Sequence, residues 1–314
     1  MAGDNSSFKI DLTSTPDLNF GRMVFYRMKN RDGFLPEIAV DAGDPGRPYL
    51  KLAVKEGVYQ GPLGDENDFN DRCELRERQG SEQALGTAVY YGFSIRIDPG
   101  FPTVPHRCVV AQIKMPYGGS ADASPAFSLR IDSGRYVATV EQLFRPEDRA
   151  AGGLVPRKPG ATCANGSTLA EDHSESTAQL QIRAVLATDS SGLPDHLDRS
   201  NFVFCTKGMT IEKFGTLPGD PGEWHDFIVF IGILGKLDGR GEIALYHEGE
   251  LLAKATGNFG APHDARNIQY FKIGIYRDDD DRTWGDTTAC IHVRDIRRGA
   301  RLDEVWLEWQ KPTV

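Results

Sequence analysis

Short runs of alternating or continuously apolar residues recur along this chain of 314 residues, and Gly, Pro, Asn or Asp separate most of them. Runs of this length and pattern predict β-strands. The 34 glycines and 18 prolines predict many turns, and no long segment keeps a helical period. We therefore predict an all-β fold. The expected strands lie at 88–98, 108–115, 126–132, 135–143, 178–187, 201–206, 225–234, 242–255, 269–277 and 290–298.

The run at 242–255 contains Glu248-Gly249, which predicts a hairpin turn between two antiparallel arms. The segment at about 145–198 is rich in Gly, Pro, Ser and charge, and it holds one strand-like run, at 180–187. Strands on both sides of this segment are needed to complete one sandwich. We therefore predict a single domain over residues 1–314, with an irregular surface insertion at about 145–198.

The charge and hydropathy of the chain exclude two classes of partner. A formal net charge of -9 argues against nucleic acid, whose binding requires clustered Lys and Arg. No apolar stretch is long enough to cross a bilayer, and the first thirty residues lack the basic start and apolar run of a secretion signal. We expect no nucleic-acid partner and no membrane partner.

Five cysteines are present, widely spaced and without a CxxC pair: Cys73, Cys108, Cys163, Cys205 and Cys290. This pattern indicates neither a zinc site nor a full disulfide framework. We expect mainly buried free thiols. Cys163 and Cys205, which flank the most irregular region, are the first candidates for a disulfide.

Two of the expected strands, at 108–115 and 269–277, and the segment 72–76, taken as a further strand, each combine an apolar face with a face of cationic or hydrogen-bonding groups, because residues two apart in a strand share a face. The polar faces carry Arg72, Glu74 and Arg76, then Gln112 and Lys114, then Tyr270, Lys272, Gly274 and Tyr276. The apolar faces carry Cys73 and Leu75, then Val109, Ala111, Ile113 and Met115, then Phe271, Ile273 and Ile275. A solvated outer surface is the simpler interpretation, but Arg, Gln, Lys and Tyr with few acids favour a surface that binds an anionic sugar.

These segments resemble the motifs of a known enzyme group. RCELRE at 72–77 resembles the R-x-E-L-R element of alginate lyases, QIK at 112–114 resembles their Q-I-H element, and YFKIGIY at 270–276 is similar to their Y-F-K-x-G-x-Y strand. EWHDF at 223–227, DGRG at 238–241 and EIALYHEGELL resemble more closely the heparin lyase I-like and glucuronan lyase relatives. The matching elements cover about residues 72–298.

The resemblance implies a concanavalin-like β-jelly roll, a two-sheet antiparallel sandwich whose concave sheet binds an acidic polysaccharide and cleaves it by β-elimination. Lys114 replaces the family histidine after Gln-Ile, which favours a glucuronan-like substrate over alginate. The implied partner is an anionic polysaccharide or oligosaccharide, and no cofactor or metal is expected. The substrate class predicts a secreted or periplasmic location.

Elimination from a uronate requires donors that neutralise its carboxylate as the C5 proton leaves. Arg72 and Gln112 suit this role, because they provide a charged planar fork and an amide donor. Glu74 is expected to orient its neighbouring arginines. The other candidate substrate-binding residues are Arg76, Lys272, Tyr270, His106 and Arg130.

By its place in the motif, Tyr276 is the expected acid, and it serves as both acid and base where both groups lie on the same side of the sugar. Its ordinary pKa of about 10 means that neighbouring cations must favour the phenolate. Lys114 and His106 are alternative bases. His225 is expected to be a paired strand histidine, and the acidic run at 278–281 a solvated loop rather than a calcium site.

Two other functions fit the same fold. A glycoside hydrolase requires two carboxylates that flank the bond, but Glu74 and Glu77 are expected to point to opposite faces. A non-catalytic carbohydrate-binding module would use the same surface without cleavage.

Overall fold

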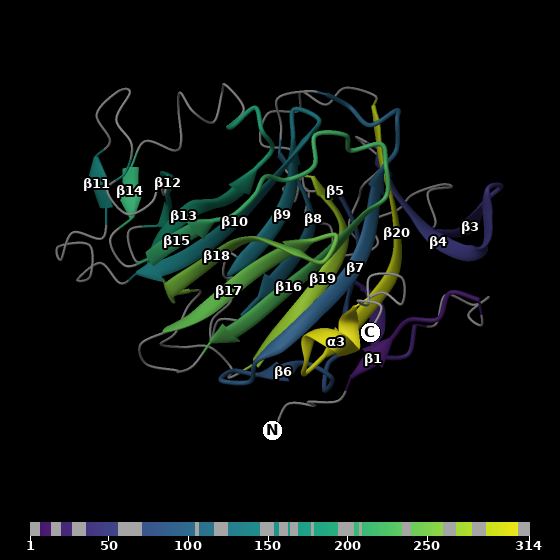
Figure 1. Cartoon of the computed structure of the whole chain (residues 1–314), viewed down its shortest axis with the longest axis horizontal. Coiled ribbons are helices and arrows are strands. Elements are labelled where there is room, and N and C mark those ends of the chain that lie inside the picture. Colours follow the sequence, from purple (N-terminus) through teal and green to yellow (C-terminus); the bar gives the residue numbers. More distant parts are fainter. Residues whose placement is uncertain are drawn as a thin grey trace.

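Two antiparallel β-sheets stack on one another in the computed structural model, with one short helix beside them (Figure 1). The structure describes residues 7–13, 20–26, 36–55, 71–103, 107–115, 125–144, 154–156, 163, 169–176, 179–193, 204–206, 209–233, 240–259, 268–277 and 287–306. Within these ranges, no helix has the length and apolar character needed to span a bilayer.

One sheet has nine strands in the order β15-β18-β17-β16-β7-β20-β4-β3, and β1 also pairs with β20. Its strands are β1 (Phe8–Lys9), β3 (Glu37–Asp41), β4 (Asp44–Lys55), β7 (Val89–Ile97), β15 (Met209–Lys213), β16 (His225–Ile233), β17 (Arg240–His247), β18 (Glu250–Asn258) and β20 (Thr288–Gly299). The helix α3 (Leu302–Val305) follows β20.

The other sheet has eleven strands in the order β11-β14-β12-β13-β10-β9-β8-β19-β5-β2, and β6 also pairs with β19. Its strands are β2 (Met23–Tyr26), β5 (Asp71–Glu77), β6 (Gln83–Ala84), β8 (Arg107–Lys114), β9 (Phe127–Asp132), β10 (Arg135–Phe144), β11 (Leu154–Pro156), β12 (Leu169–Ser176), β13 (Gln179–Thr188), β14 (Phe204–Thr206) and β19 (Ile268–Arg277).

This architecture confirms the predicted β-jelly-roll sandwich. The hairpin turn at Glu248-Gly249 is also confirmed, since both residues have positive φ (50° and 83°) and His247 pairs with Glu250. The insertion differs from the prediction of a single strand-like run. β11 and β12 also lie inside it. β12 pairs with β13 and β14, and its polar sequence, LAEDHSES, lacks the apolar alternation that indicates a strand.

Aromatic side chains from both sheets meet in the core. The rings of Tyr91 on β7 and Phe271 on β19 stack with centroids 4.8 Å apart, and those of Tyr136 on β10 and Phe227 on β16 meet edge to face at 5.6 Å. Five of the residues predicted to face the core are fully buried there, which confirms the predicted orientation of three strands. They are Leu75, Ile113, Phe271, Ile273 and Ile275.

Val109 is an exception to the predicted core. The β8–β9 register shifts between Val109 and Ala111, as expected of a β-bulge, and Val110 rather than Val109 joins the core cluster. Strict alternation places Val109 and Ala111 on the same face. The bulge inserts an extra residue and sends Val109 to the face that carries Gln112.

Glu77 points away from Glu74, as predicted, and lies between the two sheets. Its carboxylate accepts hydrogen bonds from Arg298 on β20, from the Tyr91 hydroxyl at 3.0 Å and from the Phe271 amide at 2.7 Å. Burial raises the pKa of Glu77 to about 7, against the opposing effect of Arg298. Glu77 therefore joins the sheets and is unavailable to a substrate on the outer face.

The cysteine predictions are confirmed. Cys163 and Cys205 form a disulfide, and Cys73, Cys108 and Cys290 are buried free thiols. Burial raises the pKa of both Cys73 and Cys290 to about 12, so neither is a nucleophile at neutral pH.

Candidate active site

Strands β5, β19, β8 and β9 are neighbours in the eleven-stranded sheet, and their outward side chains form one continuous surface, here called the polar face. The register places Tyr276 opposite Arg72 and places Lys272 opposite both Arg76 and Gln112. At the other end of β19, Tyr270 lies opposite Lys114. Three segments far apart in sequence therefore bring most of the predicted site residues to one face.

Glu74 is the centre of this surface. Its Oε1 accepts a hydrogen bond from the Gln112 amide, and its Oε2 accepts one from Lys272 Nζ at 3.3 Å and lies 3.9 Å from Arg72 Nη1. Glu74 is 2% exposed and Lys272 is fully buried. A buried carboxylate in these contacts fixes the positions of its donors, because breaking any one leaves a desolvated charge.

Each arginine of β5 stacks on a tyrosine of β19. The Arg72 guanidinium lies 4.0 Å from the centroid of the Tyr276 ring, and that of Arg76 lies 4.6 Å from Tyr270. Arg76 also forms an ion pair with Glu82 at 3.3 Å. Glu74 was expected to orient both arginines, and the ion pairs show it beside Arg72, with Glu82 beside Arg76.

The backbone geometry at Gly274 explains why the YFKIGIY strand has a glycine at this position. Its φ is +147°, and a Cβ at this position would lie 2.2 Å from the Cys73 carbonyl oxygen. The β19–β8 register shifts between Ile273 and Tyr276, on either side of this residue. The close approach of β5 and β19 at Gly274 sets the position of Tyr276 against Arg72.

Arg130 belongs to a second ionic cluster on the same sheet. Its Nη2 lies 2.8 Å from Glu141 Oε1, its Nε donates to the Thr139 hydroxyl at 3.0 Å, and Arg183 Nε donates to Glu141 Oε1 at 2.7 Å. Arg130 was predicted as a site residue from the sequence, and Glu141 and Arg183 were not. The alternation of polar and apolar residues in β10 and β13 can be recognised in the sequence, but the pairing of these two strands cannot.

The three ionic clusters on this face hold more cations than carboxylates. The clusters around Glu74, Glu82 and Glu141 contain five guanidinium or ammonium groups for three carboxylates. The chain as a whole has a net charge of -9, so the excess is local. A local excess of cations attracts and orients an anionic ligand.

The two candidate proton carriers lie on either side of Gln112. Tyr276 pairs with Val109 toward one end of β8, and Lys114 pairs with Tyr270 at the other. His106, an alternative base, and the acidic run at 278–281 lie outside the described residues.

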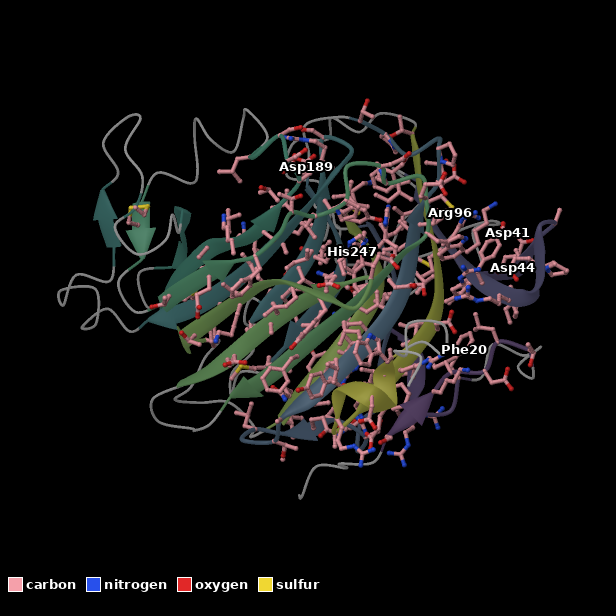
Figure 2. The ribbon with its side chains drawn as sticks, viewed as in Figure 1. Phe20, Asp41, Asp44, Arg96, Asp189 and His247 are labelled. Atoms are coloured by element: carbon pink, nitrogen blue, oxygen red, sulfur yellow. A yellow bond between two sulfur atoms is a disulfide. The ribbon has the colours of Figure 1, made fainter. Side chains whose placement is uncertain are left out.

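Trp224, in the EWHDF segment, packs on the nine-stranded sheet. Its ring centroid lies 4.0 Å from the Arg294 guanidinium carbon, and its Nε1 donates to Asp41, which also accepts hydrogen bonds from Nη1 and Nη2 of Arg96. Arg96 and Asp41 are labelled close together in Figure 2. These contacts give Trp224 a structural role outside the polar face.

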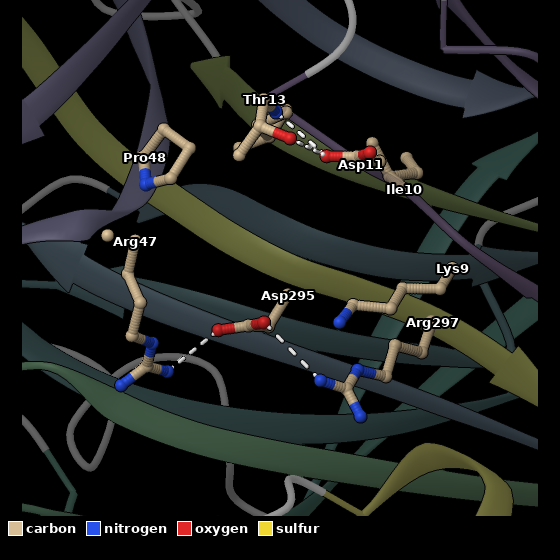
Figure 3. Close-up of a pocket in the computed structure, with 10 residues that line it drawn as sticks. Lys9, Ile10, Asp11, Thr13, Arg47, Pro48, Asp295 and Arg297 are labelled. Carbon is tan, nitrogen blue, oxygen red and sulfur yellow. Dashed lines mark hydrogen bonds and ion pairs between the residues drawn. The ribbon is translucent and has the colours of Figure 1, made fainter.

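A pocket of about 660 Å³ lies along β20, where Lys9, Arg47, Asp295 and Arg297 contribute to its lining (Figure 3). Asp295 accepts from Arg47 at 2.8 Å and from Arg297 at 3.4 Å. The pocket belongs to the nine-stranded sheet, and it contains none of the predicted site residues. None of the family-like motifs contributes to it, so the polar face remains the candidate active site.

The fold and the polar face together are those of a β-jelly-roll carbohydrate-active protein. The family model described as polysaccharide lyase matches residues 45–297, which is most of the chain. The chain therefore belongs to the polysaccharide lyase family, and it is an enzyme that cleaves by β-elimination. No curated protein sequence matches it.

One of two similar solved structures supports the fold. An endo-β-1,4-glucuronan lyase from the fungus Trichoderma reesei is 16% identical, with a TM-score of 0.55, over 95% of this chain and 97% of that one. Alginate lyase PA1167 from Pseudomonas aeruginosa is 13% identical, with a TM-score of 0.43, over 87% and 88% of the two chains. The first similarity supports the jelly-roll fold, and the second is too low to add to it.

Proposed function

We propose that this lyase acts on a uronic-acid polysaccharide, with β-linked glucuronate preferred over alginate. The observation that carries the proposal is the contact of Arg72 with the Tyr276 ring, beside the Glu74–Gln112–Lys272 cluster. It places a fixed cation, an amide and a phenol on one positively charged face. A substrate with a carboxylate next to an acidic C–H needs this combination.

In this proposal, Arg72 and the second amide hydrogen of Gln112 bind the uronate carboxylate. As H5 leaves, negative charge moves onto that carboxylate, and these two donors stabilise it most in the transition state. Glu74 and Lys272 act as positioning residues. Glu74 holds the Gln112 amide, and Lys272 balances the charge of the buried Glu74.

Tyr276 is the proposed proton carrier. Its phenolate takes the proton from C5, the C4–C5 double bond forms, the C4–O4 bond breaks, and the proton passes to the departing O4. The positive charge of Arg72 on the ring favours the phenolate over the neutral phenol. One residue serves both steps where H5 and O4 lie on the same side of the sugar, as in glucuronate.

Lys114 is the alternative base. It occupies the position of the histidine in the alginate lyase motif, and it lies beyond Gln112 from Tyr276. An ammonium there adds to the positive charge of the face. The absence of a histidine at this position is the reason for preferring glucuronan as substrate.

A panel of glucuronan, alginate, heparin and hyaluronan tests the proposal, with ultraviolet absorbance of the unsaturated product as the readout. We expect the highest kcat/KM on glucuronan. Cellulose oligosaccharides provide the matched control, because they keep a β-1,4-linked glucose backbone without the carboxylate, and they should give no product. Faster cleavage of alginate or heparin would refute the substrate assignment.

A further inference from the structure

Two histidines that the mechanism does not use meet at one end of the nine-stranded sheet. His225 begins β16, and His247 ends β17, the strand beside it. Nδ1 of His225 lies 3.2 Å from Nε2 of His247, and the same Nε2 lies 3.5 Å from Glu248 Oε1. The three side chains thus present two ring nitrogens and a carboxylate oxygen to one point. Figure 2 labels His247.

The distances fit a tetrahedral metal site. Zinc binds histidine nitrogen and carboxylate oxygen at about 2.0–2.2 Å, so two ligand atoms at a tetrahedral angle lie about 3.4 Å apart. The two measured distances lie on either side of this value, and the three ligand atoms all lie within 4.8 Å of one another. Two imidazoles with one carboxylate favour zinc over calcium or magnesium, which prefer oxygen ligands.

The surroundings prepare each ligand for a metal. Nε2 of His225 is within hydrogen-bond distance of the Asp220 carbonyl oxygen. A carbonyl only accepts, so this nitrogen carries the proton and Nδ1 keeps its lone pair. Glu248 Oε1 accepts from the Asp226 amide at 3.0 Å. Such outer hydrogen bonds orient metal ligands in proteins.

The site is closed toward the core and open toward solvent. Phe227 packs against both histidine rings, and Tyr136 meets the edge of His225, which closes the inner side. Glu248 remains 36% exposed, so a metal has access from solvent.

We propose that His225, His247 and Glu248 form a zinc site that joins the start of β16 to the β17–β18 hairpin. A water molecule would complete the tetrahedron on the open side. The site lies on the sheet opposite to the polar face, so its role is structural. The hairpin turn explains the position of Glu248, whose φ of 50° turns its side chain back toward His247.

The test uses full-length protein stripped of metal with a chelator and then desalted. Titration with Zn²⁺ should show one equivalent bound per chain and a rise in Tm, because a ligand that binds only the folded state stabilises it. Co²⁺ should give the visible absorption of a tetrahedral site with nitrogen and oxygen ligands. Mg²⁺ should produce neither effect.

Three variants identify the ligands: His225→Gln, His247→Gln and Glu248→Gln. Each should weaken Zn²⁺ binding by at least the roughly 10–100-fold cost of losing an outer-shell partner. His247 and Glu248 are only partly buried, so these two variants decide the result if His225→Gln fails to fold. Asp98→Asn is the matched control, because it removes a carboxylate from the other three-residue group in the described chain, Asp98, Cys290 and His292.

The control should bind Zn²⁺ as the parent does. Absence of Zn²⁺ binding would show that the His225–His247 contact is only a hydrogen bond. Binding that survives in His247→Gln and Glu248→Gln, or that is lost in Asp98→Asn alone, would also overturn the proposal.

Discussion

The guanidinium of Arg72 lies 4.0 Å from the centre of the Tyr276 ring, and the two residues are direct partners across β5 and β19. A cation over an aromatic face is itself attractive, so the pair holds both side chains in place. In the proposed mechanism, the same pair supplies the charge that stabilises the substrate carboxylate and the phenol that moves the proton.

Arg72→Ala should lower turnover more than stability. The variant removes a charge whose contribution grows as the C5 proton leaves, and the loss of such a donor costs about 10²–10³ in kcat. Steady-state kinetics on the best substrate of the panel, with Tm measured in parallel, test this. An unchanged kcat with a raised KM would show that Arg72 contributes only to binding.

Glu74→Gln should destabilise the fold, because it removes a carboxylate that pairs with the fully buried Lys272. Breaking a buried ion pair costs about 3–5 kcal/mol. Urea unfolding measures the loss. Glu82→Gln is the control, since its partner Arg76 is 20% exposed, and a smaller loss is expected there. Equal losses in both variants would refute a central role for Glu74.

Gly274→Ala should disturb the site through the backbone. The added Cβ would collide with the Cys73 carbonyl at a φ that alanine rarely adopts. We expect lower Tm and lower activity together, because the collision separates β5 from β19 and moves Tyr276 off Arg72. Gly46→Ala is the control, with nothing within 4 Å of its Cβ. A Gly274→Ala enzyme with parental Tm and kcat would contradict this account of the YFKIGIY strand.

His247 should make the metal-free protein less stable as pH falls. Its pKa is about 4 in the folded state, against an ordinary 6.5, so the unfolded chain binds more protons between these values. Stability should therefore fall as pH drops from 6.5 to 4, and His247→Gln should lack this component. Burial also raises the pKa of Asp226 to about 6, which lowers stability as pH rises. The quantity to measure is therefore the difference in free energy of urea unfolding between the parent and His247→Gln, as a function of pH. Identical profiles would contradict the prediction.

The local pattern of polar and apolar residues was sufficient to predict most strands and the two faces of β5 and β19. Alternation identified Glu74 and Tyr276 on one side and Leu75 and Ile273 on the other. Bulges were not predictable, because they depend on which strand pairs with which. Val109 was assigned to the core for this reason.

The ionic clusters likewise depend partly on local sequence and partly on which strands pair. Arg72, Gln112 and Tyr276 were selected through their motifs, but Glu141 and Arg183 appeared only when β10 and β13 were seen to pair. The contact of His225 with His247 likewise depends on the pairing of β16 with β17. The sequence predicted the strand on which each of these residues lies, but their neighbours depend on the pairing of strands that are far apart in the sequence.

Tyr276→Phe tests the central claim most directly. The variant keeps the ring that stacks on Arg72 and removes only the hydroxyl, so its Tm should match that of the parent. Product absorbance on the best substrate should show that elimination falls by orders of magnitude. Lys114→Met, which removes a charge on the other side of Gln112, should retain far more activity. Near-parental turnover by Tyr276→Phe, or an equally deep loss in Lys114→Met alone, would contradict the assignment of Tyr276 as the proton carrier.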